Sequence, residues 1–299
     1  MSSLDKLWEL LGEEKKEEVP VVKEELKKEE KKEETQIVKQ ETQVIEEVQK
    51  EEKLETQNLF EEEPVPAKEV FLIFGDKGTG KTVTAMSFPG EVLVLSFDRK
   101  SAIIKSTFYG GDKRIHVFDV VKYMDYSTPE KMVETAEKTF TYINYILDNY
   151  TNHYPQPDWV VIDSAQIFQQ ICEWTMRYRH NIGPFDGIAN LNLWKERRMY
   201  IRQIHNKALN LAKKGVIYTT YVEKDETIVK GEVVNKKDVP AWIDVLIYET
   251  DYVMQTYVEN DRFKVKVVSS KNPRKVPPGE YDVTNRNFFE SLKSRGGSL

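Results

Sequence analysis

The sequence predicts an α/β fold with a mostly parallel sheet, helices on both faces and antiparallel strands at the C-terminal edge. The first observation is a set of continuous apolar runs, each typical of a strand buried on both faces, at 70–74, 92–97, 115–118, 159–162 and 216–220. Helical patterns lie between these runs, and strands that alternate with helices favour a parallel sheet with right-handed crossovers. After residue 222, short alternating segments predict antiparallel strands that extend one edge, at 227–234, 241–249, 252–258 and 263–269.

Two of the helices are well marked. The first is expected to begin at Ser127, with Pro129 in the first turn and Glu130 completing a capping box. Its apolar stripe consists of Met132, Ala136, Phe140, Ile143 and Leu147. The second is expected to span residues 193–213, with Gly215 as its stop signal.

The charge divides the chain into two parts. Residues 1–66 hold 21 acidic and 11 basic residues, and within them 13–57 are dominated by Glu and Lys, in runs such as 27–34 that have no apolar face. Such a segment cannot bury enough surface to offset its ordering entropy, so we expect 1–66 to be a largely disordered N-terminal extension. Residues 67–299 hold 29 acidic and 33 basic residues and form the predicted folded domain. Its mildly basic charge permits a polyanionic partner without requiring one.

The extension begins with a short apolar motif at 4–11, formed by Leu4, Leu7, Trp8, Leu10 and Leu11. An apolar peptide on a long charged tether is typical of a partner-docking motif. Residues 1–12 therefore either bind a protein partner or fold back on the main domain.

The composition also indicates where the protein works. The single cysteine, Cys172, excludes a disulfide within the chain and is expected to be a core residue of a helix. No stretch approaches the roughly 18 apolar residues of a membrane helix. The first 14 residues mix acidic and basic side chains, unlike a secretion signal. We therefore expect a cytoplasmic protein with no membrane partner.

The chemistry is concentrated in one loop, which matches G-x-x-x-x-G-K-[ST] in full. It consists of Gly75, Asp76, Lys77, Gly78, Thr79, Gly80, Lys81 and Thr82. The glycines let successive backbone N–H groups point at a phosphate, Lys81 reaches the β- and γ-phosphates, and the Thr82 hydroxyl ligates Mg²⁺. The loop follows a buried strand and opens a helix at about 81–87, which presents its positive end to the same anion. The sequence therefore predicts a site for ATP, or a close relative, with Mg²⁺.

Two acids complete the predicted site. Asp163 directly follows the apolar run 159–162, the pattern of a second Mg²⁺ ligand at a strand end. Asp98 follows the run 92–97, so it should lie at the same edge of the sheet and orient or deprotonate water. The alternative for Asp98 is that it caps the next helix near Ser101.

The end of the fifth strand supplies one more candidate. Thr220 closes that strand, where a polar side chain can sense the γ-phosphate. Thr219, Tyr221 and Lys224 compete for this role.

These residues resemble those of a known group. The loop, the short helix ending at 87–90, the strand 92–97 and Asp98 are similar to the RecA-like P-loop ATPases. Within that group, residues 70–280 are most similar to the nucleotide-binding ATPases of phages and archaeal viruses, including the RadA-like single-strand annealing proteins. The resemblance implies a RecA-like core and a Mg²⁺-dependent ATPase that acts on DNA in recombination, annealing or replication. If the protein is viral, its cytoplasm is that of the host.

The resemblance also implies residue roles. Asp98 matches the water-activating acid and Thr220 the polar residue after the fifth strand. Lys271 and Arg274 match a basic pair that reaches the nucleotide of the neighbouring subunit, although their spacing departs from the usual K-x-R. That role implies a homo-oligomer, either a ring or a filament. The alternative is a solvated basic turn.

Contact with single-stranded DNA is the remaining expectation. The second helix and its end carry Lys195, Arg197, Arg198, Arg202, Lys207, Lys213 and Lys214, and the segment 176–192 is a candidate lining for a DNA path. A solvated helix face explains the basic residues equally well. The alternative function is a nucleotide-dependent assembly switch that recruits a protein partner without acting on nucleic acid. A small-molecule kinase is less favoured because no Arg-rich lid is evident.

Overall fold

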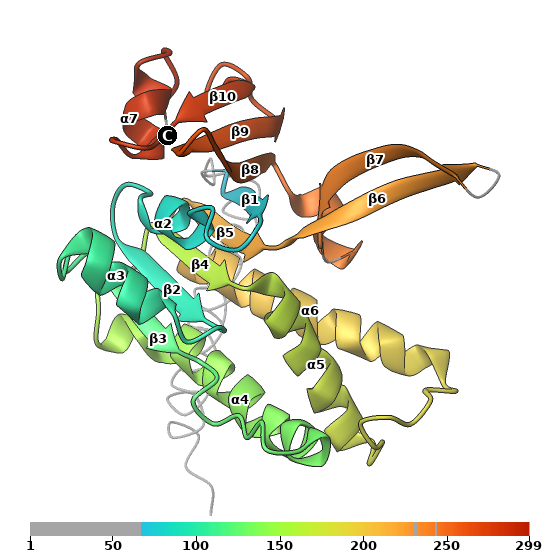
Figure 1. Cartoon of the computed structure of the whole chain (residues 1–299). Coiled ribbons are helices and arrows are strands. Elements are labelled where there is room, and N and C mark those ends of the chain that lie inside the picture. Colours follow the sequence, from blue (N-terminus) through green and yellow to red (C-terminus); the bar gives the residue numbers. More distant parts are fainter. Residues whose placement is uncertain (1–66, 230–231, 243, 299) are drawn as a thin grey trace, which may run out of the picture. The chain divides into compact units, whose positions relative to one another are not determined.

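The computed structural model describes residues 67–229, 232–242 and 244–298, which belong to one compact unit (Figure 1). The N-terminal extension 1–66, with its apolar motif at 4–11, lies outside the described residues, so the predictions about it remain predictions. Within the described part of the chain, no helix is both long and apolar enough to cross a membrane.

An eight-stranded sheet forms the centre, in the order β10-β9-β8-β1-β5-β4-β2-β3. Its strands are β1 (Glu69–Gly75), β2 (Val92–Ser96), β3 (Ile115–Asp119), β4 (Trp159–Asp163), β5 (Gly215–Thr220), β8 (Tyr252–Glu259), β9 (Arg262–Ser270) and β10 (Gly279–Asp282). The strands from β8 to β3 in this order pair in parallel, and β9 and β10 continue the sheet antiparallel. The predicted fold class is therefore confirmed.

Helices cover both faces of this sheet (Figure 1). They are α2 (Lys81–Met86), α3 (Ser101–Tyr109), α4 (Pro129–Asn149), α5 (Ala165–Arg179), α6 (Leu191–Leu211) and α7 (Phe288–Lys293), with short 3₁₀ turns η2 (Tyr150–Asn152) and η3 (Asp244–Glu249). Alternate residues of each strand serve the two faces, because successive side chains point to opposite sides. In β2, for example, Leu93 and Leu95 join the core under α4, α5 and α6, whereas Val92 and Val94 join the core under α2 and α7.

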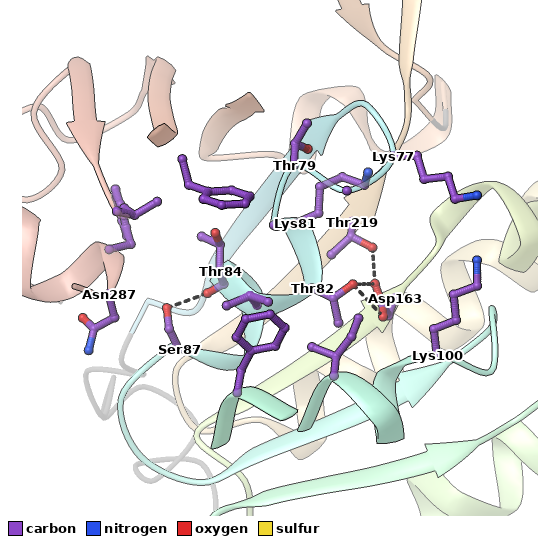
Figure 2. Close-up of a pocket in the computed structure, with 18 of the residues that line it drawn as sticks. Lys77, Thr79, Lys81, Thr82, Thr84, Ser87, Lys100, Asp163, Thr219 and Asn287 are labelled. Atoms are coloured by element: carbon purple, nitrogen blue, oxygen red, sulfur yellow. Dashed lines mark hydrogen bonds between the residues drawn. The ribbon is translucent and has the colours of Figure 1, made fainter. Parts of the chain in front are cut away.

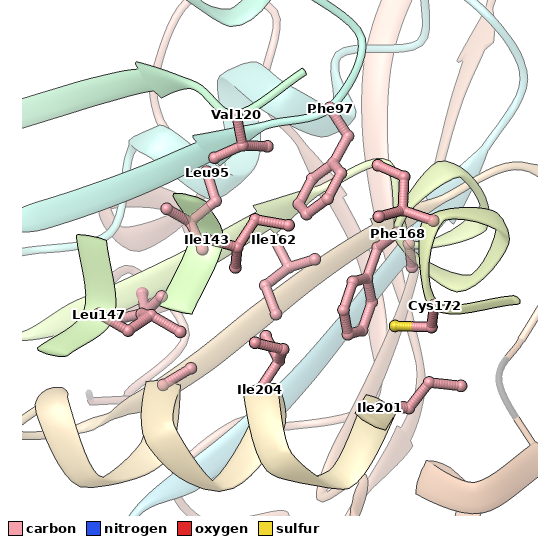
Figure 3. Packing of buried hydrophobic residues seen from close by; sticks show 14 of the residues in the cluster. Leu95, Phe97, Val120, Ile143, Leu147, Ile162, Phe168, Cys172, Ile201 and Ile204 are labelled. Carbon is pink, nitrogen blue, oxygen red and sulfur yellow. The ribbon is translucent and has the colours of Figure 1, made fainter. Parts of the chain in front are cut away.

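The larger core explains why the central helices pack where they do. Leu95 and Ile162 of the sheet lie against apolar side chains from all three helices (Figure 3). Cys172 belongs to this cluster as a fully buried residue of α5. The expectation of a core cysteine in a helix is met.

Two predicted helix boundaries were wrong. The cap of α4 is Thr128, whose hydroxyl accepts a hydrogen bond from the Lys131 N–H at 3.2 Å, so the helix starts one residue later than expected. Helix α6 ends at Leu211, and Gly215 is the first residue of β5 rather than a stop signal. A Cβ on Gly215 would lie 1.9 Å from the Glu69 carbonyl oxygen, so glycine is required there by the close approach of β1 and β5. Lys213 and Lys214 therefore follow the helix.

The segment after β5 also differs from expectation. Strands β6 (Val222–Val229) and β7 (Glu232–Pro240) form a separate antiparallel ribbon that projects from the body (Figure 1). The single strand expected at 227–234 is wrong: its first residues end β6 and its last residues begin β7. Similar apolar residues at the ends of both strands made the segment look continuous. The strand expected at 241–249 is instead the 3₁₀ turn η3. Leu246 of that turn is fully buried, so its apolar residues pack as a turn against the helical layer.

Candidate active site

The carboxyl ends of the parallel strands carry the predicted site residues. Gly75 ends β1, Asp163 ends β4, and Asp98 lies two residues beyond β2. Asp163 is paired in register with Thr219 of β5 on one side and Ser96 of β2 on the other. Parallel strands bring their carboxyl ends to one edge, which is why Asp98, Asp163 and Thr219, so far apart in sequence, line one cavity.

The loop between β1 and α2 is held in a fixed conformation. A Cβ on Gly75 would lie 2.2 Å from the Thr256 carbonyl oxygen of β8, so only glycine fits at this position. Gly78 and Gly80 have φ of 83° and 90°, in the left-handed region that glycine enters at little cost. The Thr79 hydroxyl lies 2.8 Å from that of Thr256 and donates to the Asp76 carbonyl at 2.8 Å. The loop is thus braced against the sheet.

Lys81 lies over this loop, and no carboxylate of the described residues is in direct contact with it. Its Nζ donates to the carbonyl oxygens of Gly75 at 2.9 Å and Asp76 at 2.8 Å, and lies 4.4 Å from the centre of the Tyr221 ring. Burial lowers the pKa of Lys81, and the nearby carboxylates of Asp163, Asp76 and Asp98 partly oppose this. An ammonium held only by neutral acceptors is well placed to exchange them for a phosphate.

Asp163 is the most buried charged group of the site, at 2% exposure. Its carboxylate accepts hydrogen bonds from the hydroxyls of Thr82 at 3.0 Å, Ser101 at 2.6 Å and Thr219 at 2.5 Å. Figure 2 shows Thr82 and Thr219 converging on it from two sides. Burial raises the pKa of Asp163, and these hydrogen bonds offset the shift only in part. A buried carboxylate beside a threonine hydroxyl is the oxygen donor set that Mg²⁺ prefers, so the residues fit the predicted ion.

Asp98 is half-buried and lines the same cavity. Its Oδ1 accepts a hydrogen bond from the Lys100 N–H at 3.0 Å, just before α3 begins, while its other oxygen has no hydrogen-bond partner among the described residues. Its role with water stays a prediction. A third acid, Asp119, ends β3 at the same edge but does not line the cavity; its carboxylate accepts from the Val121 N–H.

The two threonines at the end of β5 have different partners. Thr219 contacts Asp163, and its hydroxyl oxygen also accepts the Ser164 N–H at 2.9 Å. The Thr220 hydroxyl instead donates to the Ala241 carbonyl at 2.6 Å. The structure brings Thr219 to the acid, whereas the role of Thr220 as a phosphate sensor stays a prediction.

Lys271 and Arg274 are not among the residues that line the cavity. They follow β9, whose last residue Ser270 pairs with Tyr252, which in turn pairs with Phe71 near the start of β1. From Phe71 to Gly75 the strand rises about 13 Å, so this turn lies at the opposite edge of the sheet. The Lys271 Nζ is 2.6 Å from Asp251 Oδ1. Their role at a neighbouring subunit stays a prediction.

The whole cavity has a volume of about 510 Å³. One half of it is apolar, and this half was not predicted from the sequence. Its apolar lining comes from Ile104 and Phe108 of α3, Phe263 of β9, and Val283 and Phe288 near the C-terminus. Asn287 marks this end, and Lys77, Lys81 and Lys100 surround the other, near Asp163 (Figure 2). No local motif marks these residues, because the fold gathers them from separate segments.

A parallel sheet whose first strand leads through a glycine-rich loop into a helix, with a buried acid two strands away, defines a P-loop nucleoside triphosphatase. A family model described as "AAA domain" matches residues 67–279, and the chain belongs to this family. Proteins with this domain are generally ATPases, so the activity of the chain is nucleotide-dependent. No curated protein matches the chain.

Proposed function

We propose that this protein is a Mg²⁺-dependent ATPase that acts on DNA as a homo-oligomer. The observation that carries the proposal is the division of the cavity: Lys81, Thr82 and Asp163 gather at one end, and the other end is apolar. The polar end suits the phosphates, and the apolar end, lined by Phe108 and Phe263, suits a nucleobase. The volume of the cavity lies in the ordinary range for a ligand of this size.

Thr82 and Asp163 would hold the magnesium ion, which when bound neutralises charge on the phosphates. Lys81 and the N-terminus of α2 stabilise the negative charge that grows during phosphoryl transfer. Asp98 accepts a hydrogen bond from the attacking water and orients it, since its second carboxylate oxygen is available at the cavity wall. The catalytic contribution of the chain is thus mainly positioning and electrostatics.

Helix α6 supports contact with single-stranded DNA. Lys195 and Arg198 lie on its exposed side, and Phe185 in the preceding loop is 82% exposed. Positive charge beside exposed aromatic rings is the combination that binds single strands without sequence preference. Other basic residues of this helix serve the fold, because Arg197 pairs with Glu173, Arg202 with Glu249 and Lys207 with Asp148.

The resemblance to the RecA-like ATPases of phages and archaeal viruses adds recombination, single-strand annealing or replication as the setting. Antiparallel strands beyond the parallel part of the sheet agree with that resemblance. It also supports oligomerisation, since Lys271 and Arg274 lie too far from their own cavity to act there.

The test is the rate of ATP hydrolysis with and without single-stranded DNA at low salt, where phosphate contacts are strongest. We expect DNA to stimulate the wild type, and Lys81→Ala to be inactive under both conditions. The Lys195→Ala/Arg198→Ala variant should keep the basal rate and lose the stimulation. Lys207→Ala removes a charge from the same helix that is already paired, so it should keep both. A wild-type rate that DNA leaves unchanged contradicts the DNA part of the proposal.

The second candidate is the assembly switch that recruits a protein partner. The internal pairing of Arg197 and Lys207 favours it, because it leaves few basic side chains of α6 for a nucleic acid. Deleting residues 1–60 should then abolish partner binding and leave hydrolysis intact, while DNA has no effect on the rate.

A further inference from the structure

We propose that the hydroxyl of Ser164, together with the N-terminus of α5, binds the terminal phosphate group of the nucleotide. This inference rests on the proposed nucleotide hydrolysis and assigns a contact that the phosphate loop cannot make. The site would then have two helix N-termini, that of α2 and that of α5, whose N-cap Ser164 directly follows Asp163.

The backbone of Ser164 is the first observation. Its φ of 81° and ψ of 74° place a residue that is not glycine in the left-handed region. Such strained conformations persist only where the surroundings impose them, and they gather at functional sites. Here the surroundings are the end of β5, since the Ser164 N–H donates to Thr219, which donates in turn to Asp163.

The hydroxyl is the second observation. Ser164 is 6% exposed and lines the cavity, and its enclosed Oγ has no hydrogen-bond partner in the described part of the chain. Buried hydroxyls are almost always hydrogen-bonded, so an orphan hydroxyl in a residue that lines a ligand cavity indicates a missing partner.

The helix end is the third observation. Serine at an N-cap usually accepts a hydrogen bond from the first turn of its helix, and Ser164 makes no such bond. The 15-residue helix α5 therefore has uncapped N–H groups and the positive end of its dipole beside Ser164, which lines the cavity. An anion satisfies both the helix end and the hydroxyl.

The ligand is a phosphate oxygen because of what surrounds the hydroxyl. Asp98 and Asp163 are acceptors with negative charge, so neither can hold an anion, whereas Ser164 can donate. No base lies within hydrogen-bonding distance of the hydroxyl, which excludes a nucleophilic serine of the kind that a neighbouring base activates. The terminal phosphate then lies between Lys81 and α2 on one side and Ser164 and α5 on the other.

The experiment compares ATP and ADP, which differ only in that phosphate. Ser164→Gly removes the hydroxyl and accepts the positive φ, and Ser164→Ala removes the hydroxyl alone. Both should weaken ATP binding and lower kcat by about 10- to 100-fold, the range for a hydrogen bond to a charged group, and leave ADP binding unchanged. Thr175→Val is the matched control, because Thr175 Oγ1 is another buried orphan hydroxyl of α5 that does not line the cavity. It should leave both affinities and kcat unchanged.

Thermal midpoints separate a phosphate contact from a structural role. Without nucleotide, Ser164→Gly should unfold at the same or a higher temperature than the wild type, since it loses an unsatisfied hydroxyl and backbone strain. Its stabilisation by ATP should shrink to that given by ADP. A Ser164→Gly protein with wild-type ATP affinity and kcat overturns the inference, and so does equal weakening of ATP and ADP. A wild type that binds neither nucleotide overturns the proposed function itself.

Discussion

The two edges of the parallel sheet are built in opposite ways from the same strands. At the amino edge, charged groups pair with one another: Glu69 accepts from the Tyr252 hydroxyl at 2.9 Å and from Lys275 at 2.8 Å. Asp251 likewise accepts from the Val70 N–H at 2.9 Å and from Lys271 at 2.6 Å. At the carboxyl edge, the half-buried Lys81 and the buried Asp163 share one site without a direct ion pair. One edge is closed by its own contacts, and the other is arranged for a ligand.

The pKa shifts follow the same division. The hydrogen bond to Asp251 raises the pKa of Lys271 and so favours its charged form. Burial shifts the pKa of Lys81 downward and that of Asp163 upward, which disfavours the charged form of both. A non-glycine residue in a sparsely populated conformation, Ser164, is also found at the carboxyl edge. Functional sites concentrate such unfavourable features, which the rest of the fold supports.

The largest loss of ATPase activity is expected from a change at the amino edge, if this edge of one subunit completes the active site at the carboxyl edge of the next. Arg274 is exposed, and its side chain has no ion partner among the described residues, unlike Lys271 and Lys275 beside it. If it reaches a neighbouring nucleotide, Arg274→Ala should lower kcat by about 10³-fold, as the loss of an arginine finger does. Lys275→Ala is the matched control and should keep its activity, because Lys275 is held by Glu69.

Mixing two inactive variants tests the shared site directly. Lys81→Ala and Arg274→Ala should regain activity when mixed, because some interfaces then combine an intact loop with an intact arginine. Steady-state ATPase rates across mixing ratios measure this. A mixture as inactive as its components means that the amino edge of one subunit does not reach the active site of another. The contrast between the two edges then describes a single chain only.

A smaller loss of rate is expected within the carboxyl edge itself. Asp98→Asn keeps the shape of the side chain and removes its ability to act on water, so kcat should fall about 100-fold with little change in ATP affinity. Asp119→Asn is the control, since Asp119 ends a neighbouring strand at the same edge outside the cavity. Single-turnover rates and nucleotide titrations separate the two effects. Equal rates for the two variants would remove Asp98 from the chemistry.

The buried strands were predictable because burial on both faces leaves a continuous apolar run. Strands β1 to β5 appear within a residue or so of the expected positions, and β8 and β9 agree as closely. The ribbon β6–β7 and the turn η3 were assigned wrongly, since short apolar segments do not specify a strand until they find a partner. Helix α3 was predicted only as a helix start near Ser101, because only Ser101 among its residues is fully buried and no apolar stripe marks its length.

The site was predictable as far as local sequence determines it. The loop 75–82 is fixed by glycines and by one lysine, so a motif captures it. The sequence could not decide between Thr219 and Thr220. Neighbouring residues of a strand point to opposite faces, so an uncertainty of one residue in the strand exchanges their positions. Phe263 and Asn287 join the cavity only through the packing of β8, β9 and α7, which no short pattern records. Ser164 was visible as the residue after Asp163, but its backbone strain was not.

The smallest expected effects concern two glycines, one at each edge. Gly215→Ala places a Cβ 1.9 Å from the Glu69 carbonyl oxygen, so β1 and β5 must separate, at a cost of about 1–3 kcal/mol or more in the free energy of unfolding. A Cβ on Gly78 meets nothing within 4 Å, so Gly78→Ala costs only its left-handed conformation, about 1 kcal/mol.

The two variants should therefore affect different properties of the protein. Gly215→Ala should lower the denaturant midpoint more and keep ATP affinity, whereas Gly78→Ala should weaken ATP binding because it changes the loop that holds the phosphates. Urea titrations and ATP binding isotherms of both variants measure this. Parallel losses of stability and affinity in the two variants would show that the edges are not independent, because a change at the closed edge would then reach the phosphate loop through β1.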